Sequence, residues 1–386
     1  MQNHLYLGIV LLSIIILLTS AQQDRIVCRN EITGEELDWF TLYKLPKEHI
    51  HHDSQNIETE NDIKNNPYLD LGTAYTFITN KNQNQWQFSS ISINDSNSMP
   101  GKTMDSFYTS DDPDLGYVLY NDEADKVSII KGHTKGIILF NSKSAVWIVH
   151  SIPKYPPKKS EKLYSIHSSQ CIFGQSMLCM SFNFDQLDPI GRQLLFNFPQ
   201  IYDYHIPDGL KDNKILDNLI RATQGEHVKQ QPWFNIEQLS TVNGESLISF
   251  AKFTSYQDDL YSGLVAPTLK SSLLTETWNN GAGTLKSNCT QEYHVMNIEQ
   301  LTFDFLSIKF SVHHDHSKWA VTTLNKANLF TEIFDEENED KNENDDFHAE
   351  DVNIACIGDI NRQSEQYVLV NFYILLRLLI LINFEL

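Results

Sequence analysis

Short apolar runs are spread along the chain from Cys28 to about Phe330, and most of them are bounded by turn residues. Runs rich in β-branched and aromatic residues predict strands at 117–120, 129–130, 136–140, 145–150 and 177–182. Between them, the helical spacing of Ile215, Leu216, Leu219 and Ile220 predicts a helix over 212–223. This mixture predicts an α/β or α+β fold, in which sheets are covered by helices.

Two segments depart from this pattern. The stretch 335–351 holds ten carboxylates and one lysine in 17 residues, a composition typical of a solvated surface insertion. The last segment, 367–386, is almost wholly apolar but carries Arg377, whose burial in a membrane costs about 2.5–3.5 kcal/mol. Membrane attachment through 367–386 and a packed final helix or strand therefore both stay open.

The N-terminus resembles a secretory signal. An apolar run from Leu5 to Leu18 is followed by the small residues Thr19, Ser20 and Ala21, which predicts a signal peptide at 1–21. Entry into the secretory pathway permits disulfide bonds and N-glycosylation. The candidates are five cysteines, Cys28, Cys171, Cys179, Cys289 and Cys356, and the sequons at Asn94 and Asn288.

Net charge bears on possible partners. A formal charge of −21 argues against a nucleic-acid partner at neutral pH. Without 1–21 the chain keeps that charge and 13 of its 14 histidines, so full protonation of the imidazoles would bring it to about −8. An acidic compartment would therefore remove much of the repulsion towards DNA.

The residues most suggestive of chemistry form a repeated His-x-Lys, at His133/Lys135 and His316/Lys318. On an extended chain, residues i and i+2 share a face, so each motif presents an imidazole beside an ammonium group. A neighbouring lysine cation repels a metal ion but attracts a phosphodiester, which the imidazole can attack or protonate. The motif predicts metal-free phosphate chemistry and no cofactor.

Several histidines have competing interpretations. A metal site remains an alternative at the second motif, where His313, His314 and Asp315 are adjacent. We interpret the third copy, His227-Val228-Lys229, as incidental. The cluster formed by His49, His51 and His52 is read as a polar loop, with metal binding as the alternative. Trp39 and Trp147 are predicted to be core residues and not platforms for nucleic-acid bases.

Longer motifs accompany the repeated pair in a fixed order from Cys28 to Gln366. They are Asp38-Trp39-Phe40-x-x-Tyr43-Lys44-Leu45-Pro46, Gly132-His133-Thr134-Lys135-Gly136, VHSIPKYPP (149–157), Gln231-Pro232-Trp233, Phe250-Ala251-Lys252-Phe253, Asp258-Asp259-Leu260-Tyr261-Ser262-Gly263, DHSKW (315–319) and GDINR (358–362). In these motifs the chain resembles the deoxyribonuclease II family, which is similar in architecture to phospholipase D enzymes.

The resemblance implies a catalytic domain over 28–366, built from two pseudo-symmetric halves of about 28–200 and 201–366. Each half is expected to hold a β-sheet flanked by helices, and both contribute to one central active site. His133, Lys135, His316 and Lys318 would be catalytic, and His150 and Asn361 would bind the substrate phosphate. The plain alternatives are a core histidine at 150 and a turn cap at 361.

The implied activity is metal-independent cleavage of DNA in an acidic lysosome, digestive vacuole or secreted fluid. A phosphohistidine intermediate would leave 3′-phosphate and 5′-hydroxyl ends. We expect His133 to be the nucleophile and His316 the acid, although the pseudo-symmetry allows the reverse. A homodimer is compatible with the family. A catalytically impaired DNA-binding protein and a phosphodiesterase with another substrate are the alternative functions.

The chain also departs from the family pattern. Ala320 stands where the family commonly has a cysteine after its second HSKW, and 367–386 replaces a Gly-rich, cysteine-bearing segment. Cys289 and Cys356 could therefore pair with each other or stay free. The resemblance favours a Cys28–Cys171 disulfide.

Overall fold

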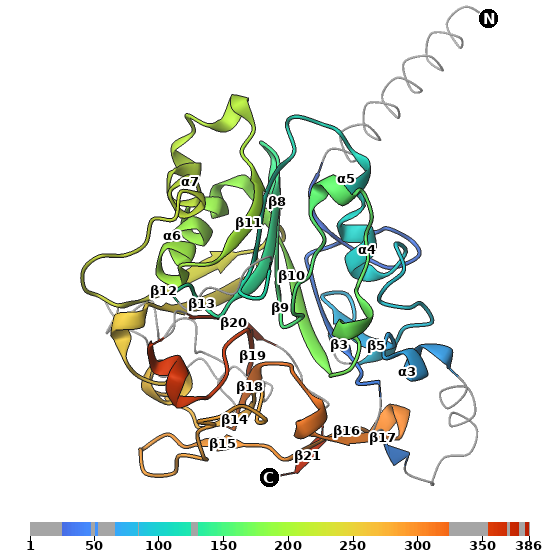
Figure 1. Ribbon diagram of the computed structural model, residues 1–386, viewed down its shortest axis with the longest axis vertical. Helices are drawn as coiled ribbons and strands as arrows, with labels where there is room; N and C mark the ends of the chain where they lie inside the picture. Colours follow the sequence, from blue (N-terminus) through green and yellow to red (C-terminus); the bar gives the residue numbers. More distant parts are fainter. Residues whose placement is uncertain are drawn as a thin grey trace, which may run out of the picture.

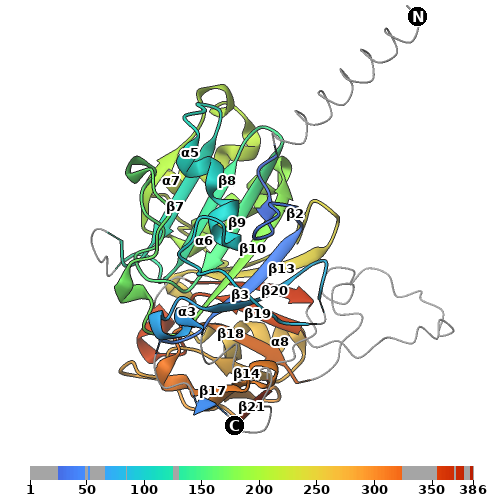
Figure 2. The same ribbon diagram turned by 90° about the vertical axis from the view of Figure 1, so that its right-hand side faces the viewer.

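The computed structural model describes residues 25–47, 51–52, 66–83, 85–124, 130–323, 354–368, 371–377 and 383–385. The expected signal segment at 1–21 and the acidic stretch at 335–351 lie outside these ranges. Two large sheets and a few short helices make up a mixed α/β fold, as the sequence predicts. Figures 1 and 2 show the first sheet above the second, with the chain passing from blue and green strands to orange and red ones.

The first sheet has eight strands, and every neighbouring pair in it is antiparallel. In spatial order they are β11 (Ile201–His205), β7 (Gly116–Asn121), β8 (Lys135–Phe140), β9 (Ser144–His150), β10 (Gln175–Asn183), β3 (Trp39–Lys44), β5 (Tyr75–Thr79) and β6 (Gln87–Phe88). Four of the five predicted strands are confirmed by β7 to β10. The fifth, at 129–130, forms no strand in the described part, because Ile130 lies in a bend and is 67% exposed.

The second sheet has seven strands, and only β14 and β15 run parallel within it. Their order is β12 (Phe234–Ser240), β13 (Ser246–Lys252), β20 (Asn371–Arg377), β19 (Ile354–Gly358), β18 (Trp319–Thr322), β14 (Leu273–Glu276) and β15 (Val295–Asn297). The backbone of β20 thus lies inside the sheet, between β13 and β19. Residues 371–377 of the apolar terminus therefore form a strand within this sheet.

Two smaller sheets complete the β-structure. One consists of β21 (Asn383–Glu385), β16 (Gln300–Phe303), β17 (Ile308–Ser311) and β4 (His51–His52), and the other pairs β1 (Cys28–Arg29) with β2 (Glu36–Leu37). His51 and His52 therefore belong to a short strand and not to the polar loop that we expected, while His49 lies outside the described residues.

The helices among the described residues are short. They are α3 (Pro67–Leu71), α4 (Met99–Thr103), α5 (Asp105–Thr109), α6 (Leu187–Asn197), α7 (Asp217–Thr223) and α8 (Ala266–Leu269), which follows a π-helical turn at Tyr261–Val265. The helix predicted at 212–223 is thus only α7, preceded by a 3₁₀ turn at Lys214–Leu216. No helix in the described part of the chain is long and apolar enough to cross a membrane.

Hydrophobic core clusters pack against the faces of the two large sheets. The largest core cluster joins both sheets with α6 and α7, and it contains the fully buried Trp39 and Trp147, which confirms their predicted place in the core. A second cluster lies between the first sheet and α4 and α5, and a third lies between the second sheet and α8. The two large sheets therefore share one core, which fixes the edge of one relative to the other.

The expected Cys28–Cys171 disulfide is wrong, because Cys28 is bonded to Cys179, with 6.1 Å between their Cα atoms. Strand β1 lies against β10, where the Cys28 N–H donates to Ser181 Oγ at 2.8 Å. Cys171 precedes β10 and lies beside Lys44, which donates to its carbonyl at 2.8 Å. Cys171, Cys289 and Cys356 are free, so the possible Cys289–Cys356 pair does not form.

Two short strands pair across the boundary of about residue 200 that was expected between the halves. Strand β11, at Ile201–His205, belongs to the first sheet, so that unit extends past residue 200. In the other direction, β4 at His51–His52 pairs with β17 of the later part of the chain. The two parts exchange short segments at their margins.

Candidate active site

Each His-x-Lys motif lies at the start of a strand. The antiparallel neighbour of that strand leads, at its end, to one of the two expected phosphate-binding residues. Lys135 opens β8, and His150 closes the neighbouring β9. Lys318 directly precedes β18, and Asn361 follows the end of the neighbouring β19. Because antiparallel partners bring the start of one strand to the end of the next, each pair of strands presents its polar residues at one edge. Strand β19 also contacts β9 and β10, so the two edges meet.

The His133 imidazole is oriented by the other part of the chain. Its Nδ1 lies 2.9 Å from the backbone carbonyl of Asp359, just after β19. A carbonyl oxygen can only accept, so Nδ1 carries the proton, and Nε2 of the neutral ring keeps its lone pair. This Nε2 faces Asp122 Oδ2 at 3.5 Å, and the side chain is 17% exposed. His133 therefore presents a basic nitrogen at the surface of the site.

The His316 imidazole is held in the reciprocal way. Its Nδ1 lies 3.1 Å from the carbonyl of Ser151, just after β9, and 3.2 Å from Gln175 Oε1. Both are acceptors, so Nδ1 again carries the proton and Nε2 is left basic. The ring packs against Trp278 with 5.0 Å between ring centres. Each histidine is thus fixed by a backbone carbonyl from the opposite part of the chain.

The two lysines differ in their surroundings. Lys135 Nζ forms a short contact with Asp122 Oδ1 and lies 3.6 Å from Glu123. Burial opposes its charge, but the two carboxylates outweigh burial and raise the pKa of Lys135 above its ordinary value. Lys318 Nζ donates to the His316 carbonyl, and burial together with Lys135 lowers the pKa of Lys318 to about 7. The two ammonium groups differ in how firmly they keep their protons.

Electrostatics shows that the four residues form one cluster. Burial lowers the pKa of His133 to about 4, partly offset by Asp122 and reinforced by Lys135 and Lys318. The pKa of His316 is lowered well below its ordinary value by burial and then by Lys318, Lys135 and His133. Both imidazoles are therefore neutral in the unliganded protein unless a nearby anion compensates for the lysines. The structure brings together all four residues that the sequence singled out.

Asp359 locks the first motif in place with its side chain as well as its carbonyl. Its Oδ2 accepts hydrogen bonds from Thr134 Oγ1 at 2.5 Å and from the Lys135 backbone N–H at 3.0 Å. Asn197 Nδ2 in turn donates to Thr134 Oγ1 at 2.9 Å. Burial raises the pKa of the Asp359 carboxyl to about 7, although the two hydrogen bonds oppose this shift.

The two predicted substrate-binding residues carry unsatisfied polar atoms. His150 is fully buried, and its Nδ1 accepts the Ile152 N–H at 3.2 Å, which leaves the proton of the neutral ring on Nε2. That Nε2 has no hydrogen-bond partner, nor has the buried Oδ1 of Asn361. Since buried polar atoms are normally paired, both residues have unused capacity to bind a ligand.

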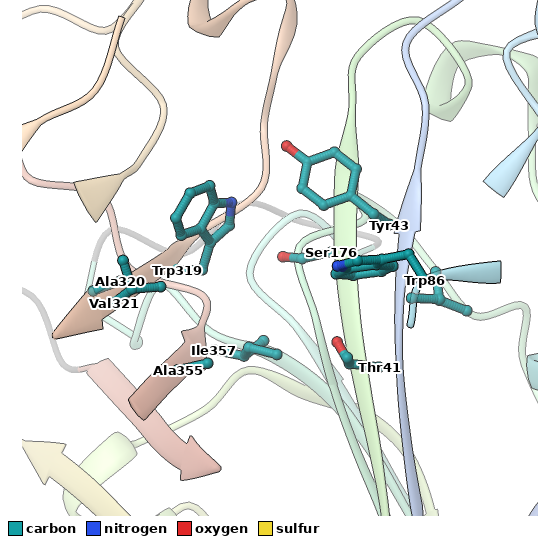
Figure 3. A pocket seen from close by; sticks show the side chains of 10 residues that line it. Thr41, Tyr43, Trp86, Ser176, Trp319, Ala320, Val321, Ala355 and Ile357 are labelled. Carbon is teal, nitrogen blue, oxygen red and sulfur yellow. The ribbon is translucent and has the colours of Figure 1, made fainter. Parts of the chain in front are cut away.

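A small apolar cavity lies behind the second motif and is separate from the cluster. About 40 Å³ in volume, it lies between the two sheets, and Figure 3 shows Tyr43, Trp86 and Ser176 on one side with Trp319 and Ile357 on the other. Its size suits about one water molecule and no nucleotide. We interpret it as imperfect packing at the junction of the sheets.

The remaining candidates have other contacts. Asp315 is buried and accepts hydrogen bonds from Tyr43 and Ser317, while His313 bonds to Asn280. Among the described residues, no three His, Cys, Asp or Glu side chains are grouped as metal ligands. Both sequon asparagines lie in surface loops, with Asn94 exposed and Asn288 partly exposed.

Asp122, Asp359, Ser151 and Gln175 were not identified from the sequence. Two of them act through a backbone carbonyl, which no side-chain pattern reveals. The available signal was a place in a quoted motif: Asp359 lies in GDINR near Asn361, and Ser151 lies in VHSIPKYPP next to His150.

The chain is similar to known proteins over most of its length. Residues 27–369 match the family model described as Deoxyribonuclease II. Deoxyribonuclease-2-alpha of Mus musculus is 34% identical over 295 residues, covering 75% of this chain and 78% of the relative. Deoxyribonuclease-2-beta of Homo sapiens is 32% identical over 348 residues (88% and 84%), and deoxyribonuclease-2 of Caenorhabditis elegans is 32% identical over 380 residues (88% and 86%).

Proposed function

Because this chain belongs to the deoxyribonuclease II family and is therefore an enzyme of the deoxyribonuclease type, we propose that it cleaves DNA phosphodiesters with His133, Lys135, His316 and Lys318 and needs no metal ion. One observation carries the proposal: two imidazoles that carry their proton on Nδ1, and so keep a basic Nε2, share one cluster with two ammonium groups. An attacking base, a proton donor and cationic phosphate ligands are all available there.

In the first step, His133 Nε2 attacks phosphorus and forms a P–N bond while the P–O5′ bond breaks. His316 gives its proton to the departing O5′, which becomes a 5′-hydroxyl. In the second step, His316 takes a proton from water, the hydroxide attacks phosphorus, and the P–N bond breaks. His133 is released and a 3′-phosphate remains. Dividing the displacement in this way replaces one difficult step by two easier ones.

The lysines supply the positive charge that metal ions provide in other nucleases. Lys135 and Lys318 attract the non-bridging oxygens, and the unpaired Nε2–H of His150 can donate to one of them. The backbone N–H of Asn361 donates to Gln366 Oε1 at 2.9 Å, and its side-chain Nδ2–H would donate to the phosphate. Both halves of the fold then bind one phosphate from opposite sides.

The electrostatics favours acidic conditions. A pKa of about 4 keeps His133 neutral, and thus nucleophilic, at pH 5. The bound phosphodiester opposes the effect of Lys135 and Lys318 on His316, so substrate binding favours the protonated form of His316 that the reaction needs. Acid also reduces the net charge of −21, which repels DNA at neutral pH.

The antiparallel pair β8 and β9 carries the first His-x-Lys and His150 in the same way as the antiparallel pair β18 and β19 carries the second His-x-Lys and Asn361. This similarity supports the pseudo-symmetric, phospholipase D-like arrangement expected from the sequence. For the location we infer the secretory pathway, with activity in an acidic organelle or fluid. The Cys28–Cys179 disulfide supports folding in an oxidising compartment.

The test is a plasmid digest by the purified protein at pH 5 and pH 7, with EDTA present in both. We expect cleavage at pH 5, much less at pH 7, and fragments that a 5′-kinase labels without prior phosphatase treatment. Rapid quenching followed by mass spectrometry should find the phosphoryl group on His133. Complete inhibition by EDTA, or 5′-phosphate ends, would contradict the proposed chemistry.

A further inference from the structure

A partly exposed tryptophan lies against one of the two catalytic histidines. The centre of the Trp278 ring is 5.0 Å from the centre of the His316 imidazole, and the two rings meet at 68°. Trp278 also contacts Phe173, with 4.9 Å between ring centres and an angle of 85°. All three side chains are partly exposed, and we call Phe173 and Trp278 the aromatic pair. The pair carries no charge, so it adds an apolar surface beside the imidazoles and ammonium groups of the cluster.

The sheet topology explains why Trp278 reaches the catalytic cluster. Strand β18, which directly follows the second His-x-Lys, lies between β19 and β14 and is antiparallel to both. The last residue of β14, Glu276, lies opposite Trp319, the first residue of β18. The chain just beyond β14 therefore lies at the edge that holds the second motif, as does the chain beyond β19 with Asn361.

The backbone around Trp278 is fixed to the segment that carries Asn361. The Arg362 N–H donates to Thr277 Oγ1 at 3.2 Å. Gln363 Nε2 donates to the Trp278 carbonyl at 3.3 Å. These two donors directly follow Asn361, which we expect to bind the substrate phosphate. Trp278 is thus held between two parts of the site, with its ring on a catalytic histidine and its backbone beside a phosphate ligand.

Phe173 is fixed to the second motif although it belongs to the first half of the chain. Its neighbour Gly174 accepts the backbone N–H of His316 through its carbonyl at 2.9 Å. The Gly174 N–H in turn donates to the His314 carbonyl at 2.9 Å. The aromatic pair therefore combines one ring from each half, and both rings are anchored next to His316.

The corresponding place in the first half holds a different side chain. There β8, which begins with the lysine of the first motif, lies between β9 and β7, and the chain beyond β7 leads to Asp122. Asp122 faces His133 Nε2 with a carboxylate at 3.5 Å, whereas Trp278 contacts His316 with an indole ring. The two halves thus differ beside their histidines. A phosphodiester also has two unlike sides, since one nucleotide keeps the phosphate and the other leaves.

The leaving nucleotide must lie close to His316. In the proposed function this residue gives its proton to O5′, which requires Nε2 and O5′ to come within about 2.6–3.2 Å. O5′ is bonded to C5′ of the deoxyribose on the 3′ side of the cleaved bond, so this sugar lies next to the His316 ring. Its carbon atoms form an apolar surface that an indole can cover. In a duplex the sugars lie on the outside, so no base pair has to open.

We propose that Trp278, supported by Phe173, binds the deoxyribose of the leaving nucleotide and holds its O5′ beside His316. Contacts to sugar and phosphate fix the register of a protein on DNA without reading the base sequence. The subsite therefore positions the cleaved bond and adds no base preference. This inference rests on the proposed nuclease function and deepens it, since it assigns a separate contact to the leaving side of the bond.

The test compares two residues without a base, each placed on the 3′ side of one bond in an end-labelled duplex. A tetrahydrofuran abasic residue keeps the sugar ring, whereas a 1,3-propanediol linker removes the ring and keeps a primary alcohol as the leaving group. Cleavage at that bond is measured at pH 5 relative to the other bonds of the same strand. For the wild-type protein, the linker should lower cleavage roughly 3- to 30-fold relative to the tetrahydrofuran residue, because a few apolar carbon contacts are lost.

Three variants show whether this ratio comes from the indole. Trp278→Leu should bring the ratio close to one, because it removes the ring that the sugar contacts. Trp278→Phe keeps a smaller aromatic face and should give an intermediate ratio. Trp233→Leu is the matched control, because Trp233 is also partly exposed but stacks on Phe253, and it should keep the wild-type ratio. Circular dichroism and thermal unfolding establish that each variant is folded.

The outcomes separate this subsite from the nuclease itself. If the wild type cleaves the duplex but treats the two residues alike, the subsite is refuted and the nuclease function stands. The same holds if folded Trp278→Leu slows every bond yet keeps the wild-type ratio, since Trp278 then acts only on His316. Should Trp278→Leu cleave too little to measure, a wild-type ratio in Trp278→Phe refutes the subsite. If the wild-type protein cleaves neither this duplex nor plasmid DNA, both proposals fail.

Discussion

Replacement of Asp359 by Asn should make the protein lose the part of its pH-dependent stability that comes from one buried carboxyl. The carboxyl is fully buried, and its Oδ2 accepts hydrogen bonds from Thr134 and from the Lys135 backbone. An asparagine has nearly the same shape, and its Oδ1 can accept the same two hydrogen bonds. The asparagine Nδ2 would then stand where the aspartate has its Oδ1, an atom that has no hydrogen-bond partner in the wild-type protein. The change therefore removes the titration with little change in packing.

The magnitude follows from linkage. Burial raises the pKa of Asp359 to about 7 in the folded protein, against about 4 in an unfolded chain. Because the folded-state pKa is the higher one, the folded protein binds the proton more tightly. The resulting stabilisation is fully present below about pH 4 and is lost as the pH rises through 7. Between pH 4 and pH 7 the loss amounts to about 3 kcal/mol of unfolding free energy.

The assay is urea unfolding of the wild type and Asp359→Asn at pH 4 and at pH 7. Other titrating groups are common to both proteins, so the change in their stability difference isolates Asp359. Asp359→Asn should be the less stable protein at pH 4 relative to wild type, and its relative stability should improve at pH 7. Asp114→Asn, at an exposed carboxylate, should show no such change. A stability difference that is the same at both pH values would refute a raised pKa for Asp359.

Three further predictions concern the catalytic cluster. His133→Ala and His316→Ala should each abolish plasmid cleavage, and the double variant should be little slower than either, because groups that act as a unit are not additive; near-normal cleavage by one single variant would exclude the two-histidine mechanism. Lys318→Met should lower kcat on the order of 10²–10³-fold with an unchanged circular dichroism spectrum. Lys135→Met should in addition unfold at a lower urea concentration, because it leaves the partly buried carboxylate of Asp122 without its ion-pair partner. Asp122→Asn removes a carboxylate that raises the pKa of His133, so that pKa should fall below its wild-type value of about 4. NMR titration of the imidazoles measures this shift. An unchanged pKa would mean that the Asp122 carboxylate does not act on His133 Nε2.

Local patterns predict the strands that carry the first motif. The runs at 136–140 and 145–150 form β8 and β9 because β-branched residues alternate across a sheet that is buried on both faces. The His-x-Lys spacing also predicts two catalytic pairs, since it reflects the chemistry of the side chains themselves. For the apolar terminus, the sequence was compatible with both a packed segment and membrane attachment. Hydropathy alone does not distinguish a strand inside a sheet from a segment in contact with lipid.

Long-range pairing explains what could not be predicted. Nothing near Cys28 distinguishes Cys179 from Cys171, because the choice depends on β1 lying against β10. The incomplete helix at 212–223 has a local cause, since the Asn213 side chain caps a 3₁₀ turn at Ile215 and the α-helix begins only after it. His227 belongs to a His-x-Lys that we interpreted as incidental, and its ring stacks on Phe253 and contacts Phe198, neighbours that the local sequence does not reveal.

The reciprocal holding of the two histidines ties catalysis to the junction between the sheets. The His133 ring depends on a carbonyl that follows β19, and the His316 ring depends on one that follows β9. A small shift of one sheet against the other would therefore turn both imidazoles at once, and the nucleophile could not be moved without moving the acid. Strands β9 and β19 belong to separate sheets, so this relative position depends on the shared core and on hydrogen bonds across the junction, such as those of Asp359 Oδ2 with Thr134 and the Lys135 backbone. Side chains packed between the sheets, Trp319 beside Lys318 among them, thus control the geometry of attack although they take no part in the chemistry.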